Sequence, residues 1–108
     1  MLSHAVFFTL RDSSPEAVDR LVASCNKHLR DHPGVLFFSV GGRDESFDRD
    51  VNDLDFHVAL HLVFTDRASH DAYQEAPVHA VFIEENEANW ASVRVFDSRV
   101  EGGAGRSG

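Results

Sequence analysis

The stretch FHVALHLVFTDRASHDAYQEAPVHAVF, residues 56–82, decides the fold, because its sequence pattern changes from that of a strand to that of helices. Its opening segment, FHVALHLVF, alternates between two faces as a half-buried strand does. Residues 65–76 are predicted to form a short helix, with Thr65 or Asp66 as its N-cap. Pro77 suits the first turn of a second helix, because a proline there gives up no helical hydrogen bond. The stretch therefore predicts one strand followed by two helices.

The flanking sequence predicts three further strands, over residues 3–11, 34–42 and 90–98. The first two of these are apolar at both alternating positions, which is typical of strands covered on both faces. Residues 43–55 are rich in acidic side chains and have no regular apolar period, so they predict a solvated loop. Their spacing does not match a calcium-binding EF-hand loop.

One more helix is predicted between the first two strands. Ser13 and Glu16 have the spacing of a capping box, and Pro15 fits the first turn. The sequence HPG at 32–34 ends the helix, because proline disfavours helix at the residue before it and glycine permits a turn. An apolar stripe follows helical spacing through Val18, Leu21, Val22, Cys25 and Leu29.

The predicted order is β-α-β-β-α-β, the ferredoxin-like α+β arrangement. That fold leaves one face of its sheet without helices, and here several strands would place apolar residues on that face. An exposed apolar patch of this size favours burial against a second copy. We therefore expect a homodimer in which two sheets pack face to face as a dimeric α+β barrel. The domain is expected over residues 1–98, with a disordered tail at 99–108.

Composition excludes several partners. The chain of 108 residues has a formal net charge of −8 and a pI of about 5.2, so it would repel nucleic-acid phosphates and anionic membrane surfaces. No apolar run is long enough to cross a membrane, and the first residues lack the basic segment of a signal peptide. A cytoplasmic location is expected. The single cysteine, Cys25, is expected to be a buried apolar residue.

Four segments carry a resemblance to a known family: SHAVFFTLR, HPGVLFFSVG, ALHLVFTDRASHDAYQEAPVHAVF and WASVRVFD. Together they resemble the stress-responsive dimeric α/β-barrel (Dabb) domains over about residues 3–98. The resemblance implies a ferredoxin-like fold and a homodimer. Members of that family include plant stress proteins without assigned chemistry and a plant polyketide cyclase that works without a cofactor.

In that cyclase a tyrosine and a histidine act as acid and base on a poly-β-keto thioester. The resemblance places these roles on Tyr73 and His79, which flank Pro77, and matches a first-strand histidine to His4. Trp90 matches a tryptophan before the last strand.

One position departs from the cyclase. Its third-strand histidine aligns without gaps to Val58, whereas the nearest histidine here is His57. A shift of one residue turns a side chain to the other face of a strand. His57 and His61 are therefore expected to face the dimer interface, and His4 and His79 to face a cavity on the helix side.

The candidate catalytic residues are His4, Tyr73 and His79. Histidine exchanges protons near neutral pH, and a tyrosine hydroxyl can stabilise a developing oxyanion. The alternative is that Tyr73 and His79 only pack, with polar tips that reach solvent or each other. The expected ligand-binding residues are Val6, Phe8, Val58, Leu60, Phe82 and Trp90.

No metal site and no cofactor are expected. His57 and His61 lie about 13 Å apart along a strand, too far to bind one ion within a subunit. His28, His32 and His70 are expected on solvated helix surfaces or ends.

Three functions remain open at this point. The first is the binding of a small, largely apolar molecule in the helix-side cavity. The second is cofactor-independent acid–base catalysis of the cyclase or isomerase kind. The third is a non-catalytic, stress-related structural role.

Overall fold

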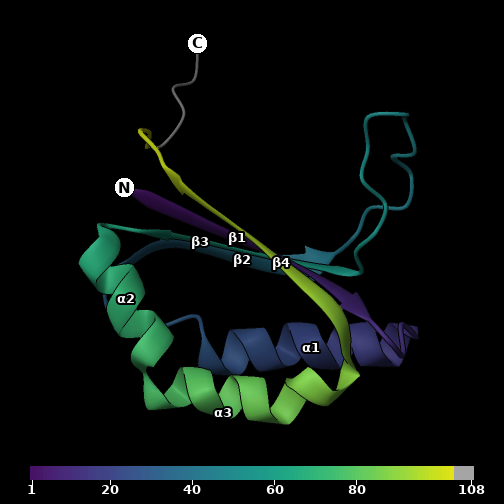
Figure 1. Cartoon of the computed structure of the whole chain (residues 1–108), viewed down its shortest axis with the longest axis horizontal. Helices are drawn as coiled ribbons and strands as arrows, with labels where there is room; N and C mark the ends of the chain where they lie inside the picture. The colour runs from purple at the N-terminus through teal and green to yellow at the C-terminus, as the bar shows by residue number, and fades with distance from the viewer. Residues whose placement is uncertain (104–108) are drawn as a thin grey trace.

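The computed structural model describes residues 1–103, which form a four-stranded antiparallel sheet with its helices on one face (Figure 1). The strands lie in the order β2-β3-β1-β4. The elements are β1 (Leu2–Leu10), α1 (Pro15–His28), β2 (Val35–Gly42), β3 (Val58–Phe64), α2 (Arg67–Glu75), α3 (Pro77–Asn86), the short 3-10 helix η1 (Glu87–Asn89) and β4 (Trp90–Arg99). The predicted ferredoxin-like α+β order is confirmed, with its second helical segment divided into α2 and α3.

The start of α2 and the break between α2 and α3 are explained by local sequence. Asp66 is the N-cap of α2, and its Oδ1 accepts a hydrogen bond from the Ser69 backbone N–H at 2.8 Å. Ala76, which precedes Pro77, has the extended backbone that a following proline favours. Pro77 then begins α3, as predicted.

The N-terminus of α1 differs from the prediction by one residue. Ser14 is the N-cap in place of Ser13, and its Oγ accepts from the Ala17 backbone N–H at 3.3 Å. The reason is that Pro15 occupies the first helical position, so the residue directly before it must be the cap. After α1 the chain turns through Gly34, whose φ of +87° favours glycine.

Alternation along the central strands separates a core face from an open face. In β3 every second residue from Val58 to Phe64 is buried, and the residues between them are only partly buried. The same pattern holds in β1, where His4, Val6 and Phe8 point to the helices. The core therefore lies between the sheet and the helices.

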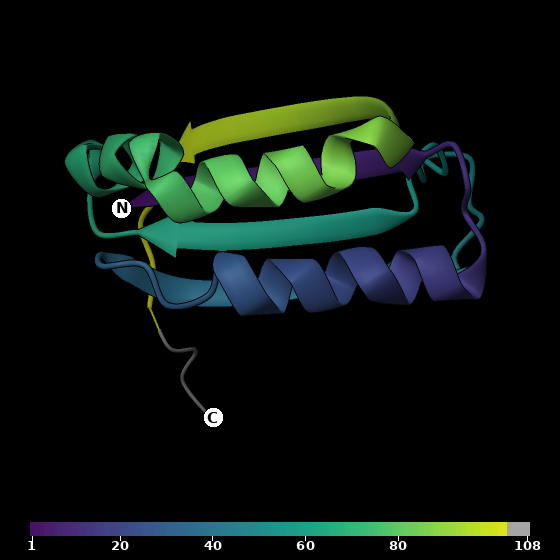
Figure 2. The same cartoon turned by 90° about the horizontal axis from the view of Figure 1, so that it is seen from below.

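The helices leave part of the core face uncovered. In Figure 2, which looks onto the helix side, α1 lies in front of β2, while β4 extends along the opposite edge of the sheet beside α3. As a result, Val93 and Val95 of β4 face the helix side but keep 38% and 49% of their surface exposed. This uncovered strip forms one wall of the cavity described below.

The open face of the sheet carries aromatic side chains. Phe37 and Phe96 expose about half of their surface, 51% and 52%. Phe7 lies between Phe96 and Phe56, with ring centroids 5.8 Å and 5.1 Å away. The loop between β2 and β3 rises on this side of the sheet (Figure 1), and Arg94 of β4 contacts its Asp53 at 2.6 Å.

The chain ends of the described region pair with each other. The backbone N–H of Val100 donates to the Met1 carbonyl at 2.9 Å, which continues the β1–β4 ladder. β4 extends one residue beyond the expected 90–98, and half of the expected tail, residues 104–108, lies outside the described residues. None of the helices within residues 1–103 is long and apolar enough to cross a membrane.

Candidate functional site

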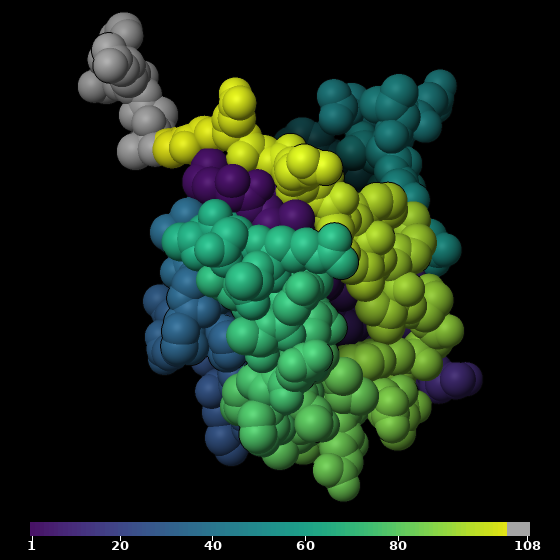
Figure 3. Space-filling model, turned by 60° about the vertical axis from the view of Figure 1, so that its left-hand side comes forward, coloured from purple at the N-terminus to yellow at the C-terminus, as the bar shows by residue number. Residues whose placement is uncertain are grey.

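A cavity of about 320 Å³ lies between the uncovered strip of the sheet and helices α2 and α3. Figure 3 shows it as a hollow between α2–α3 (teal to green) and β4 (yellow), with β1 (purple) at its base. Its apolar walls are formed by Val6, Phe8, Leu60, Phe82, Ile83, Trp90, Val93 and Val95. Its polar groups are His4, His70, Tyr73, Gln74, His79 and Asp97.

Five of the six expected ligand-binding residues line this cavity; they are Val6, Phe8, Leu60, Phe82 and Trp90. Phe82 and Trp90 close one end by packing against Phe8, with ring centroids 6.4 Å and 5.1 Å away. The sixth residue, Val58, is fully buried in the core and does not reach the cavity. The binding role of the five stays a prediction.

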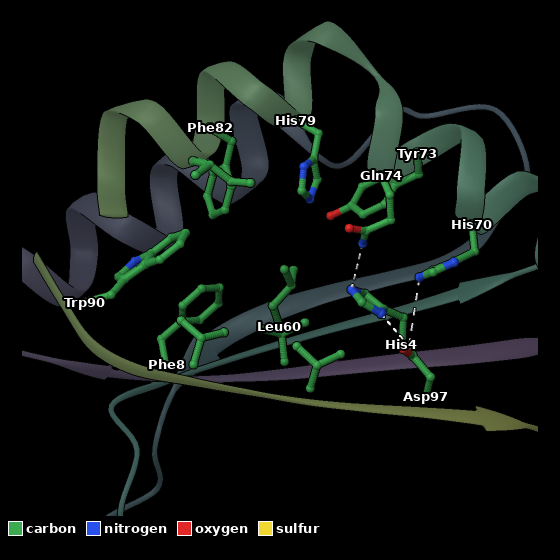
Figure 4. A pocket seen from close by; sticks show the side chains of 14 residues that line it. His4, Phe8, Leu60, His70, Tyr73, Gln74, His79, Phe82, Trp90 and Asp97 are labelled. Atoms are coloured by element: carbon green, nitrogen blue, oxygen red, sulfur yellow. Dashed lines mark hydrogen bonds and ion pairs between the residues drawn. The ribbon is translucent and has the colours of Figure 1, made fainter. Parts of the chain in front are cut away.

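His4 lies at the polar end of the cavity and is only 5% exposed (Figure 4). Its Nδ1 is 2.6 Å from Asp97 Oδ1, and its Nε2 is 3.5 Å from the amide nitrogen of Gln74. Because a carboxylate only accepts, Nδ1 carries the proton and Nε2 presents its lone pair toward the Gln74 amide. Burial lowers the pKa of His4, and Asp97 opposes that effect in part. The pair thus holds a neutral imidazole in a fixed orientation.

Tyr73 and His79 meet edge to face across the α2–α3 break, with ring centroids 4.9 Å apart. Tyr73 is 2% exposed, and its hydroxyl points into the cavity without a hydrogen-bond partner among residues 1–103 (Figure 4). Burial raises the pKa of Tyr73 and lowers that of His79, which His4 and His70 lower further. At neutral pH the cavity therefore contains a neutral phenol that can donate and a neutral imidazole that can accept.

The structure brings His4, Tyr73 and His79 to one end of one cavity. The rings of His4 and Tyr73 are 6.1 Å apart, and Tyr73 lies between the two histidines. Their catalytic role stays a prediction.

Three polar residues of the site were not expected: His70, Gln74 and Asp97. The expectation that His70 is solvated is wrong, because its side chain is 15% exposed and its ring lies 4.9 Å from that of His4. Helical spacing offered a signal, since His70 precedes Tyr73 by three residues and shares its face. Asp97 lies opposite His4 in the β1–β4 register, which sequence alone does not fix.

The other histidines lie outside the cavity. His61 is on the open face, where its Nε2 is 3.0 Å from Ser3 Oγ and its ring packs on Phe37. His57 Nδ1 accepts from the Leu10 backbone N–H at 2.9 Å, just before β3 begins. His28 pairs with Glu85 at 3.0 Å and its side chain is only 10% exposed, so the expectation that it is solvated is also wrong.

The single cysteine of the chain is inaccessible to solvent. Cys25 is fully buried in α1, and burial raises the pKa of its thiol to about 12. It therefore contributes to packing, as expected.

The sequence profile of the Stress responsive A/B Barrel Domain (Dabb) matches residues 2–100. No curated protein matches the chain.

Solved structures share the fold at low identity. A Dabb family protein with a ferredoxin-like fold from Mesorhizobium loti is 22% identical, with 94% of this chain and 97% of that chain covered and a TM-score of 0.76. A dimeric ferredoxin-like protein of unknown function from Thermobifida fusca is 16% identical, with 92% and 90% covered and a TM-score of 0.74. A hydroxynitrile lyase from Passiflora edulis is 17% identical, with 96% of both chains covered and a TM-score of 0.74.

Proposed function

This chain belongs to the stress responsive A/B barrel (Dabb) domain family, and from that premise we propose that it binds a small, largely apolar molecule bearing a carbonyl or hydroxyl oxygen. The cavity beside α2 and α3 is the binding site, and the binding unit is a homodimer.

The cavity carries the proposal. Its volume of about 320 Å³ is at the small end of ligand sites, so it suits a monocyclic aromatic or short aliphatic molecule. Apolar side chains form most of its wall, and the hydrogen-bonding groups gather at one end. That arrangement is typical of sites that bury an apolar body and orient one polar group.

The polar end fits an oxygen that accepts a hydrogen bond. The Tyr73 hydroxyl has no protein partner among the described residues and is aimed into the cavity. A ligand oxygen would accept from it, while the lone pair of His4 Nε2 or of a His79 ring nitrogen would accept from a ligand hydroxyl. The apolar end, at Phe8 and Trp90, would contact the hydrocarbon part.

Screening small aromatic and aliphatic aldehydes, ketones and alcohols by calorimetry tests the proposal. We expect binding by some of these compounds that Val95→Phe abolishes, because Val95 lines the cavity and is half exposed. Val81→Phe is the matched control, since Val81 has similar exposure on α3 and does not line the cavity. Binding that both variants retain would place the ligand elsewhere and contradict the proposal.

A second candidate, cofactor-independent acid–base catalysis, is favoured by one observation. Asp97 fixes the His4 ring by a 2.6 Å hydrogen bond to Nδ1, so that Nε2, which faces the Gln74 amide at 3.5 Å, presents its lone pair within the cavity. His79 is a second neutral base, and Tyr73 can donate to the oxyanion that forms. Removal of a proton from the carbon beside a carbonyl requires a base and a hydrogen-bond donor of this kind. Cleavage of a hydroxynitrile, the reaction class named for the Passiflora edulis protein, requires the same two groups.

Two assays test catalysis directly. Deuterium exchange at the carbon beside the carbonyl of a bound ketone reports proton abstraction, and release of benzaldehyde from mandelonitrile reports hydroxynitrile cleavage. We expect one of these reactions in the wild type, and its loss in His79→Gln and Tyr73→Phe. Ligand binding without either reaction would leave the binding function alone. Neither binding nor reaction would favour the non-catalytic structural role.

The homodimer is supported by the open face of the sheet. Phe37 and Phe96 are half exposed there, and the loop between β2 and β3 exposes Phe47, Val51 and Leu54. Several exposed large apolar side chains on one side of a sheet are typical of an interface. The Thermobifida fusca protein of similar fold is described as dimeric.

A further inference from the structure

We propose that His4, His70 and Asp97 bind a divalent transition-metal ion of the zinc type at the wall of the cavity. Each residue offers one donor atom, and these atoms lie within 4.8 Å of one another. The metal site shares His4, Asp97 and the cavity wall with the ligand site proposed above, but it takes a different molecule and is tested separately.

The donors come from three different elements and converge on one carboxylate (Figure 4). His4 of β1 and His70 of α2 point ring nitrogens at the same oxygen of Asp97 in β4, at 2.6 Å and 4.0 Å. In a tetrahedral zinc site with bonds of about 2.0–2.1 Å, neighbouring donors lie about 3.3 Å apart. Each of these two separations differs from that value by less than 1 Å, and the His4 and His70 donors, within 4.8 Å of each other, would have to move up to about 1.5 Å closer when an ion binds.

The unsatisfied nitrogen of His70 points to a missing partner. His70 Nε2 is buried and has no hydrogen-bond partner among the described residues. A buried polar atom without a partner is costly, so native structures rarely leave one. An ion between His70 Nε2 and Asp97 would supply that partner.

The surroundings of the two imidazoles match those of metal ligands. The other nitrogen of His70, Nδ1, is 3.0 Å from Asp71 Oδ1, the carboxylate–histidine arrangement that orients a ligating ring. His4 Nε2 is 3.5 Å from the Gln74 amide. When the ion takes the place of the proton at His4 Nδ1, that proton moves to Nε2. The Gln74 side chain then turns its carbonyl oxygen toward the ring and accepts a hydrogen bond from Nε2–H. No proton is lost from the neutral histidine.

Donor chemistry and access fit the same class of ion. Two imidazoles and one carboxylate favour zinc, cobalt, nickel, iron or manganese over calcium or magnesium. His70 and Asp97 also line an outer hollow of about 610 Å³, which gives the ion a path from solvent. The remaining coordination positions are open to water or to a molecule in the cavity.

Cobalt(II) titration of untagged protein tests the site, because the ion's visible spectrum reports its coordination. We expect one Co²⁺ per chain, displaced by Zn²⁺. The affinity should fall by at least about tenfold in His70→Gln and in Asp97→Asn, by analogy with the loss of supporting groups around metals. His28→Gln is the control, since His28 pairs with Glu85 away from both hollows. Circular dichroism checks that each variant is folded.

Three results would overturn the proposal. They are a wild-type protein that remains spectrally silent with millimolar Co²⁺, binding that His70→Gln and Asp97→Asn leave unchanged, and binding that His28→Gln weakens equally. Tyr73→Phe should keep the metal. In metal-free protein, His70→Gln should keep the cavity ligand, so failure of one proposal is distinguishable from failure of the other.

Discussion

At the scale of single residues, Tyr73 belongs both to the core and to the cavity. Its ring packs between those of Phe64 and His79, at 5.2 Å and 4.9 Å, while its hydroxyl faces the cavity. The ring therefore packs in the core, and the hydroxyl faces the cavity, where we propose that a ligand binds. These two roles can be separated by removing a single oxygen atom.

Tyr73→Phe should leave the free energy of unfolding nearly unchanged, because no hydrogen bond of the described protein is lost. It should weaken binding of an oxygen-bearing ligand by about tenfold, the effect of one hydrogen bond of about 1.4 kcal/mol. Calorimetry and urea unfolding measure the two quantities. A variant that loses stability but keeps affinity would mean that the hydroxyl has only a structural role.

His79 should make the fold less stable in mild acid. Burial, with His4 and His70 nearby, lowers its pKa in the folded protein below the unfolded value of about 6.5. The unfolded chain therefore binds the proton more readily as the pH falls, so His79 stabilises the fold fully only above about pH 6.5. Urea unfolding between about pH 8 and pH 5 should give a decline that is smaller in His79→Gln. An identical decline in both proteins would contradict this assignment.

The sequence was sufficient to find the residues that stand out by type and spacing. Tyr73 and His79 flank a proline and His4 falls on one face of an apolar strand, and the family resemblance grouped these three residues at one cavity. Asp97 and His70 could not be found in the same way. Asp97 depends on how β4 pairs with β1, and His70 depends on the angle at which α2 crosses the sheet.

At the scale of elements, the start of α1 illustrates how adjacent polar residues compete for one role. Ser13 and Ser14 are equivalent by type, and Glu16 made Ser13 resemble a capping-box residue. The proline at the first helical position decides between them, because it fixes the residue before it as the cap. Asp12 adds to this by accepting the Ser14 backbone N–H at 3.0 Å.

Ser14→Ala should lower the free energy of unfolding by about 1 kcal/mol, the usual contribution of an N-cap side chain. Ser13→Ala is the matched control and should change it by less than about 0.5 kcal/mol, because Ser13 is exposed and makes no side-chain hydrogen bond in the described part of the chain. Urea unfolding of both variants measures the difference. Equal effects would mean that the cap does not contribute.

Strand boundaries show where periodicity stops being informative. The alternation of FHVALHLVF predicts a strand from Phe56, yet β3 begins at Val58. Phe56 packs instead on Phe7 of the open face, and His57 accepts a hydrogen bond from the end of β1. Tertiary contacts thus ended the strand although the local pattern continued.

At the scale of the whole molecule, the two faces of the sheet differ in what covers them. One face is covered by helices and contains the cavity, whereas the other exposes Phe37 and Phe96. The polar residues His61 and Arg94 on that open face are already engaged by Ser3 and Asp53. The apolar groups are therefore the ones left to bind another copy.

Phe96→Asp should convert the proposed homodimer to a monomer by placing an unpaired carboxylate in the proposed interface. Such a charge costs about 3–5 kcal/mol, which weakens association by at least about a hundredfold. Val81→Asp, on the exposed side of α3, should remain dimeric. Sedimentation velocity at micromolar concentration measures both. A wild-type chain that sediments as a monomer would contradict the dimeric barrel.

The pairing of β1 with β4 also has a consequence for how the protein is made. His4 and Asp97, which meet at 2.6 Å, are separated by 93 positions in the chain. On the ribosome, β1 is synthesised long before its neighbour β4. One edge of β1 therefore stays unpaired until β4 has been synthesised. Contacts this distant in sequence slow folding. The polar end of the cavity, where Asp97 meets His4, is therefore among the last features to assemble, and a nascent chain without β4 lacks it.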